Sequence, residues 1–237
     1  YKELEKKVDH SAGLRLNGAL SIAENKGRWQ ELQRQATTAQ LYDVDVRILD
    51  KDQIKKDYPI VNTDDVIGGI LMPGDGAADP SGVTHMLAKA ARQEGAQIFE
   101  KSPVEEIITK DGKISGVKVN DQIIDCEYIV LASGMWSRQI GEKAGVSIPL
   151  YPAEHFYIIT EPIKNLSKSL PVIRDFDNRT YIKEDAGKIL VGIFEGNSIP
   201  AWDKTNKVPE DFSFGEFQEN FEHFEPYLES AIKRFPV

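Results

Sequence analysis

The order of hydrophobic and polar positions changes its period along the chain, which predicts a mixed α/β protein. Trp29, Leu32 and Ala36 follow a helical spacing over residues 28–42, and the alternation from Val44 to Ile48 is typical of a half-buried strand. By the same criteria we expect helices before Gly13, at 51–58 with Asp50 as its cap, and at 80–94. Strands are expected at 14–23, 66–72 and 97–99. Helices and strands therefore alternate through this first part of the chain.

The middle of the chain is predicted to form short strands and one buried strand. The turn dipeptides Asp111-Gly112 and Asn120-Asp121 separate strands that we expect at 104–109, 113–119 and 123–126. Residues 128–132 are nearly all apolar, which indicates a strand that is covered on both faces. Ser133-Gly134 ends this strand, and a helix is expected at 136–144.

After Pro152 the pattern is dominated by strands. The expected strands are 153–160, 172–174, 179–183 and 189–194. These segments are separated by turn residues, so we predict a separate antiparallel sheet. The spacing of aromatic and aliphatic residues from Phe217 to Phe235 is helical and predicts a last helix.

Charge and cysteine content exclude several classes of function. The chain has 38 acidic and 29 basic residues, and its formal charge of -9 would repel a nucleic acid backbone. Its single cysteine, Cys126, allows neither an internal disulfide nor a cysteine-based metal site. His10, His85 and His223 have no neighbouring pattern of metal ligands, so no metal is expected.

The apolar runs of the sequence are too short for a transmembrane helix, which needs about 18 residues. Residues 1–9 alternate in charge and do not resemble a signal peptide. We therefore expect a cytoplasmic protein that neither enters a membrane nor is secreted. The chain begins with Tyr1 inside a helical pattern, so we expect it to be an internal piece of a longer polypeptide.

Residues 74–79, Gly-Asp-Gly-Ala-Ala-Asp, resemble a dinucleotide-binding turn because they follow a strand and precede a helix. Asp79 takes the place of the third glycine, and Pro80 follows at the first helical position. A carboxylate at this helix N-terminus would repel a pyrophosphate. The sequence therefore favours a capped structural turn over a phosphate site.

Three other places could carry chemistry. Ala132-Ser133-Gly134 ends a predicted buried strand, where small residues serve either the approach of a ligand or tight packing. His155 shares a strand face with Tyr157, and by itself it is better explained as a buried structural histidine than as a catalyst. Tyr181 lies between two cations, where its phenol could donate to a substrate or mark the margin of the sheet.

The order of these segments resembles a known family. GDGAADPSGVTHMLAKAARQEGA at 74–96, YIVLASGMWS at 128–137, PAEHFYIITEPI at 152–163 and LPVIRDFDNRTYIKED at 170–185 carry the resemblance. They are similar to dimethylglycine and sarcosine dehydrogenases within the D-amino acid oxidase superfamily of flavoproteins. The His-x-Tyr strand and the Pro-Val-Ile-Arg-Asp segment are its most specific parts.

The resemblance implies an α+β fold of the D-amino acid oxidase type, with a partial Rossmann-like FAD-binding lobe and an antiparallel-sheet substrate lobe. Residues 1–72 would form the first part of the substrate lobe with its helices. Residues 73–149 would form the partial FAD-binding lobe. Residues 150–237 would form the antiparallel sheet and the C-terminal helix.

The resemblance also implies roles for individual residues. Val104 would meet the adenine side of FAD through its backbone, and Ala132, Ser133, Gly134 and Trp136 would lie along the cofactor. His155 and Tyr181 would be catalytic residues of the pocket that binds a small-molecule amine. The implied activity is oxidation of an N-methyl amine, in which a hydride passes to FAD.

The chain departs from the family pattern in lacking the G-x-G-x-x-G turn and the histidine that attaches FAD in many members. We therefore expect this chain alone to bind FAD weakly or not at all and to be inactive. To act, the chain would need further segments of the same enzyme or would associate with itself.

Two functions are consistent with the sequence. The chain is either a portion of a flavin-dependent oxidoreductase of the dimethylglycine or sarcosine type, or a non-catalytic binding or assembly module with this fold.

Overall fold

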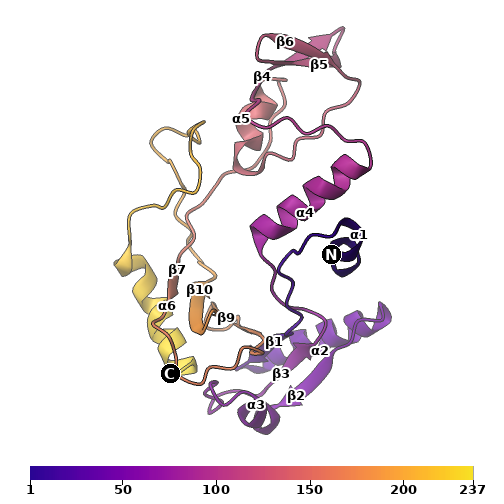
Figure 1. The fold of residues 1–237 in the computed structure, drawn as a ribbon. Helices are drawn as coiled ribbons and strands as arrows, with labels where there is room; N and C mark the ends of the chain where they lie inside the picture. The colour runs from indigo at the N-terminus through magenta and orange to yellow at the C-terminus, as the bar shows by residue number, and fades with distance from the viewer. Residues whose placement is uncertain (237) are drawn as a thin grey trace. The chain divides into compact units, whose positions relative to one another are not determined.

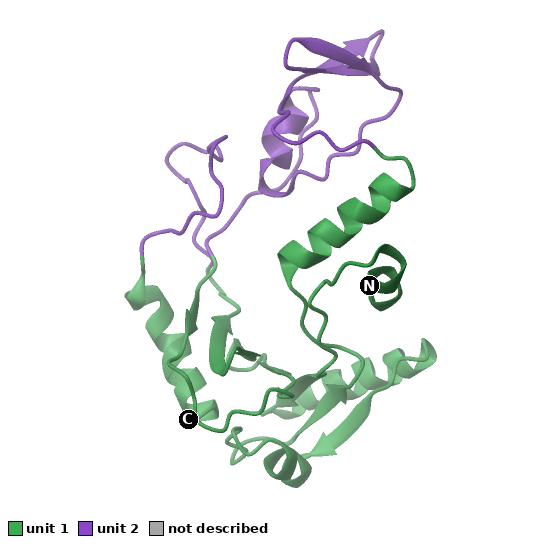
Figure 2. Ribbon diagram, in the orientation of Figure 1, with its two compact units in different colours: residues 1–96, 155–197, 219–237 green, residues 97–154, 198–218 purple. Residues whose placement is uncertain are grey.

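The computed structural model describes residues 1–236, which form two compact units (Figure 2). Unit 1 contains residues 1–96, residues 155–197 and the described part of 219–237, and unit 2 contains residues 97–154 and 198–218. Unit 1 is therefore assembled from three separate stretches of sequence. The lobe boundaries predicted after residues 72 and 149 stay a prediction.

Unit 1 is built on a seven-stranded sheet in the order β2-β3-β1-β8-β9-β10-β7 (Figure 1). The strands are β1 (Ala19–Ala23), β2 (Arg47–Asp50), β3 (Gly68–Met72), β7 (Tyr157–Ile159), β8 (Val172–Asp175), β9 (Thr180–Asp185) and β10 (Lys188–Ile193). The helices are α1 (Lys2–Val8), α2 (Lys26–Leu41), α3 (Lys51–Asp57), α4 (Pro80–Gln93) and α6 (Phe221–Arg234). Strands from the first third of the chain thus pair with strands from its last third.

The parallel pair of β1 and β8 joins these two groups of strands. Ser21 of β1 lies opposite Arg174 of β8, while β1 pairs with β3 in the antiparallel sense. The expectation of a separate antiparallel sheet after Pro152 is therefore wrong, although β8, β9, β10 and β7 are mutually antiparallel as predicted. Periodicity identifies strands but contains no information about partners that lie 150 residues away.

The two faces of this sheet differ in burial. The strands alternate, and the buried positions of the central strands face α6 and α3. The core on this side includes Leu20, Ile22, Ile54, Ile173, Ile182, Ile189, Ala231 and Phe235. On the opposite face Arg174 and Tyr181 are half-buried. On that face α2 covers β1 and β3 with a second apolar cluster, Ala23, Leu32, Ala36 and Ile70, so the polar side chains lie over the half of the sheet formed by β8, β9, β10 and β7.

Helix starts in unit 1 follow the signals in the sequence. Asp50 Oδ1 accepts a hydrogen bond of 2.8 Å from the Gln53 amide, and Gln53 Oε1 accepts one of 2.9 Å from the Asp50 amide. This reciprocal pair is a capping box, and it confirms Asp50 as the cap of α3. Within residues 1–236, no helix combines the length and the hydrophobicity that crossing a membrane would require.

Unit 2 contains a three-stranded sheet in the order β4-β5-β6. Its elements are β4 (Val104–Lys110), β5 (Lys113–Val119), β6 (Gln122–Asp125), the 3-10 helix η1 (Gly134–Trp136) and α5 (Ser137–Glu142). Asp111 and Gly112 both have a positive φ between β4 and β5. The two predicted turns and the strands around them are thereby confirmed.

The predicted buried strand at residues 128–132 is wrong. This segment is irregular, and Tyr128 and Val130 are 85% and 88% exposed. A strand needs a neighbour for its backbone hydrogen bonds, and among the described residues no strand pairs with this segment. The strand expected at 97–99 is absent as well.

A buried arginine fixes α6 to the sheet. The side chain of Arg234 is 2% exposed, and its Nε lies 2.7 Å from Oδ2 of Asp175, a residue with 0% exposure. The same guanidinium lies 2.7 Å from Asp65 Oδ1, contacts Glu24 and donates to the Asn62 carbonyl. One side chain therefore connects α6 with β8, with the residue after β1 and with the loop before β3.

We expect Arg234→Leu to lower the free energy of unfolding by about 3–5 kcal/mol, because it leaves the buried Asp175 carboxylate without its cation. Lys233→Leu is the matched control, since Lys233 forms an exposed ion pair with Asp65 and should change stability far less. Urea unfolding of both variants measures the difference. Equal effects of the two substitutions would contradict a special role for Arg234.

Candidate functional site

The open face of the unit 1 sheet carries a row of side chains at one level of the strands. Tyr181 of β9 lies opposite Arg174 of β8 on one side and opposite Gly192 of β10 on the other. Gly192 in turn lies opposite Tyr157 of the edge strand β7. Residues that are paired across strands share a face, so these four positions are neighbours on one surface.

His155 lies two residues before β7, outside the strand in which the sequence placed it. Its side chain is 50% exposed, so the interpretation as a buried structural histidine is wrong. Its Nδ1 lies 2.9 Å from Oε2 of Glu195, a carboxylate with only 4% exposure. Oε1 of Glu195 also accepts a hydrogen bond of 2.9 Å from the Phe156 amide. The Glu195 carboxylate therefore orients the imidazole.

Glu195 was missed in the sequence analysis. It lies two residues after the end of β10, and its distance from His155 along the sequence matches no pattern that would relate the two residues. Only the pairing of β10 with β7 brings the two residues together. A glutamate shortly after an apolar strand is too common a pattern to have identified it.

Tyr181 completes the cluster from β9. Its hydroxyl lies 3.5 Å from His155 Nε2, at the outer limit of a hydrogen bond, and the two rings are nearly parallel with an interplanar angle of 9°. Burial raises the pKa of Tyr181, and the nearby Glu195 carboxylate adds to the effect. The phenol is thus neutral at physiological pH and is available as a donor.

These contacts determine the arrangement of protons in the cluster. A neutral Tyr181 hydroxyl can donate to Nε2 of His155, and the Glu195 carboxylate can only accept, so Nδ1 carries the proton. We assign this tautomer from the hydrogen-bond partners. The lone pair at Nε2 then faces the Tyr181 hydroxyl, and it accepts another proton when that hydroxyl turns away to a different acceptor. The cluster can therefore accept a proton from a bound cationic group.

The Gly-Asp-Gly turn before α4 is structural, as the sequence indicated. The Asp79 carboxylate accepts hydrogen bonds from the amides of Ser81 and Gly82, the second at 2.8 Å. A Cβ at Gly76 would lie 1.9 Å from the carbonyl oxygen of Arg15, because the segment around Arg15 fills this turn. The expected cap at Asp79 is confirmed, with Pro80 as the first residue of the helix.

The residues expected along FAD lie in unit 2. The Val104 carbonyl at the start of β4 accepts a hydrogen bond of 2.9 Å from Lys143 Nζ. Ala132 is exposed, Ser133 Oγ lies 3.1 Å from Ser137 Oγ, and the Trp136 indole donates to the Pro209 carbonyl. Their roles at the cofactor stay predictions.

Gly134 is suited to close contact with a ligand. It has a φ of 54°, and a Cβ added there would meet nothing within 4 Å. The backbone is therefore open at this point, and a flat ring could approach it closely. The role of Gly134 at the cofactor stays a prediction.

The three longest helices do not offer the pyrophosphate of FAD an uncapped N-terminus. A pyrophosphate needs free amides at the N-terminus of a helix. The three longest helices that the structure describes, α2, α4 and α6, begin at Asn25, Asp79 and Asn220, whose side chains already accept from those amides. In the same residues no three His, Cys, Asp or Glu side chains form a group that could hold a metal ion.

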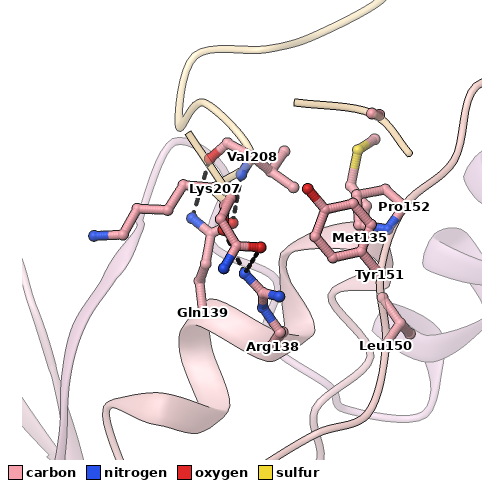
Figure 3. A pocket seen from close by; sticks show the side chains of 10 residues that line it. Met135, Arg138, Gln139, Leu150, Tyr151, Pro152, Lys207 and Val208 are labelled. Atoms are coloured by element: carbon pink, nitrogen blue, oxygen red, sulfur yellow. Dashed lines mark hydrogen bonds between the residues drawn. The ribbon is translucent and has the colours of Figure 1, made fainter. Parts of the chain in front are cut away.

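Unit 2 also contains a small cavity of about 10 Å³ beside α5 (Figure 3). Gln139 and Val208 exchange two hydrogen bonds across it, and the Arg138 guanidinium lies over the Tyr151 ring at 5.2 Å. A volume of this size holds about one water molecule. The polar groups of Gln139 and Val208 bond to each other. We therefore interpret the cavity as a packing defect of unit 2.

Comparison with known proteins identifies relatives over the whole chain. The family described as FAD dependent oxidoreductase (DAO) matches residues 1–237. A 4-methylaminobutanoate oxidase (formaldehyde-forming) of Paenarthrobacter nicotinovorans is 34% identical over 98% of this chain, and human mitochondrial sarcosine dehydrogenase is 34% identical over 100%. The mitochondrial pyruvate dehydrogenase phosphatase regulatory subunit of Mus musculus is 31% identical over 100%.

The chain spans about a quarter of these relatives, with 28%, 26% and 27% of their lengths covered. Among solved structures, L-proline dehydrogenase from P. horikoshii matches 99% of this chain and 59% of its own, with a TM-score of 0.82 and 24% identity. The predicted mixed α/β fold of the D-amino acid oxidase type and the family resemblance are confirmed.

We expect Asp79→Ala to lower the free energy of unfolding by about 0.5–2 kcal/mol, the usual contribution of an N-cap. Asp79→Asn is the matched control, because asparagine also caps helices and should retain most of the stability. Thermal unfolding with and without added phosphate measures both variants. A phosphate-dependent stabilisation that disappears in Asp79→Ala would contradict the assignment as a cap alone.

We expect the 237-residue chain alone to bind FAD weakly or not at all, because the chain lacks the G-x-G-x-x-G turn and the N-termini of its three longest helices are capped by side chains. Quenching of FAD fluorescence during titration with the purified chain measures this binding. Saturation at one FAD per chain would show that unit 2 provides a pyrophosphate site of another kind.

Proposed function

Because the chain belongs to the DAO family of FAD-dependent oxidoreductases, we propose that it forms the amine-binding part of an enzyme that oxidises an N-methylated amino acid. The single observation that carries this proposal is the cluster of His155, Tyr181 and Glu195 on the open face of the unit 1 sheet. The names of two relatives, 4-methylaminobutanoate oxidase and sarcosine dehydrogenase, refer to N-methylated amino acids.

The proposed cluster acts on the proton of the substrate amine. An amine that is protonated in solution has no free electron pair at nitrogen, so it must lose a proton before oxidation. Nε2 of His155 accepts this proton, and the buried Glu195 carboxylate stabilises the imidazolium that results. The neutral Tyr181 hydroxyl holds the imidazole from the other side and donates to the substrate when the amine occupies the site.

A second candidate function is a non-catalytic binding or assembly module. The relative named as a regulatory subunit of pyruvate dehydrogenase phosphatase supports this alternative. The two candidates differ in what they require of the cluster. A binding module would retain its function without a proton acceptor at His155, whereas an amine oxidoreductase would not.

We expect His155→Ala in the complete protein to lower amine oxidation by about 10²–10⁴-fold, the usual contribution of a general base. FAD content should stay at the wild-type level, because the side chain of His155 bonds only within the cluster. Steady-state kinetics with sarcosine and dimethylglycine, together with the flavin absorption spectrum, measure both quantities.

His85→Ala on α4 is the matched control, since His85 is exposed and lies outside the cluster. It should retain full activity. A parallel loss of FAD and activity in His155→Ala would assign His155 to the fold. Unchanged turnover in His155→Ala would favour the non-catalytic module.

A further inference from the structure

Gly192 lies directly under the ring of Tyr181 in the middle of β10. A Cβ added to Gly192 would lie 2.1 Å from Cζ, 2.3 Å from the hydroxyl oxygen and 2.4 Å from Cε1 of Tyr181. Carbon and oxygen atoms that are not bonded do not approach so closely. The phenol therefore occupies the space that the side chain of any other residue at position 192 would need.

The strand order explains why the phenol must occupy this space. Tyr181 lies on β9, while His155 lies two residues before β7, and β10 separates the two strands. Neighbouring strands are about 4.8 Å apart, so the two backbones are about 10 Å apart. The ring must lean across β10 for its hydroxyl to come within 3.5 Å of Nε2. Only a residue without a side chain permits this.

The aromatic ring of Phe194 limits the position of Tyr181 from another side. Phe194 follows Gly192 by two residues, and its ring centroid lies 5.2 Å from that of Tyr181. Gly192 thus provides the floor and Phe194 one wall of the space that holds the phenol. Neither residue contacts His155 in the described interactions.

We propose that Gly192 is a positioning residue, which places the Tyr181 hydroxyl at His155 by leaving room for the phenol over β10. This inference rests on the proposed function, in which His155 and Tyr181 bind the amine. It adds a requirement that the sequence did not reveal: a residue that contacts neither substrate nor cofactor determines whether the cluster forms.

The backbone conformation at position 192 does not itself require a glycine. Its φ lies outside the left-handed region, in contrast to Gly187 with a φ of 82°, so a residue with a side chain could adopt the backbone of position 192. The effect of a substitution at Gly192 must therefore act through the Tyr181 ring. Gly74 provides a matched control, because it also avoids the left-handed region and a Cβ there would meet nothing within 4 Å.

The test compares Gly192→Ala, Tyr181→Phe, the double variant and Gly74→Ala in the complete holoprotein. Amine kcat/KM and FAD content are measured for each protein, and the ¹⁵N resonances of the His155 imidazole are recorded without substrate. The NMR measurement reports the hydrogen bond from Tyr181 without depending on turnover. If the wild type oxidised no N-methyl amine, the proposed function would fail, but the imidazole signals would still decide the role of Gly192.

We expect Gly192→Ala to reduce kcat/KM by roughly a hundredfold, as misplacement of a catalytic group by about 1 Å can do. The Nε2 resonance of His155 should move in the same direction as in Tyr181→Phe, with FAD content unchanged. In the Tyr181→Phe background, Gly192→Ala should lower kcat/KM by less than about twofold, since two changes that act through one interaction are not additive. Gly74→Ala should behave as the wild type.

Two results would overturn the proposal: unchanged His155 resonances in Gly192→Ala, or a full loss of kcat/KM from Gly192→Ala in the Tyr181→Phe background. If Gly192→Ala does not fold, Gly192→Ala combined with Tyr181→Ala decides the question. Removal of the ring should restore folding, because the added methyl group then meets no phenol. A double variant that remains unfolded would show that Gly192 serves the strand itself.

Discussion

The buried ion cluster around Arg234 is the interaction on which the arrangement of unit 1 depends. Its guanidinium is nearly inaccessible and faces the carboxylates of Glu24, Asp65 and Asp175, which come from three separate parts of the chain. One cation cannot neutralise three carboxylates, of which Asp175 is fully buried and Glu24 and Asp65 are partly buried. Burial accordingly raises the pKa of Glu24, and the neighbouring Asp175 raises it further. The cluster connects α6 with the strands that form the parallel pair at the centre of the sheet.

On the opposite face α2 covers only β1 and β3, and the half formed by β8, β9, β10 and β7 carries the candidate site. Asp175 points toward α6, and its neighbour Arg174 points to the opposite side because side chains alternate along β8. The same alternation on β9 places Ile182 in the core and Tyr181 on the open face. The candidate site therefore depends on the core for its position, although it shares no side chain with it.

The sequence predicted local features well and long-range pairing poorly. The caps at Asp50 and Asp79 and the turn at Asp111-Gly112 depend on residues within a few positions of one another, and all three are present. The parallel pairing of β1 with β8 depends on residues about 150 positions apart, and it was missed. His155 and Tyr181 could be named because they lie in segments that resemble a known family. Glu195 could not be named, because only the pairing of β10 with β7 brings it to His155.

The separation of core and site also explains how one fold can accommodate relatives with different names. The larger core cluster and Arg234 lie on the α6 side of the sheet, and on the other side α2 covers β1 and β3 while Tyr181 lies on β9. Substitution of His155 and Tyr181 would leave both core clusters and the Arg234 cluster intact. A protein of this family could therefore lose amine oxidation, keep its fold and act as a binding partner. Under the proposed function, the side chains at positions 155, 181 and 192 would distinguish the two candidates, because both need the same core.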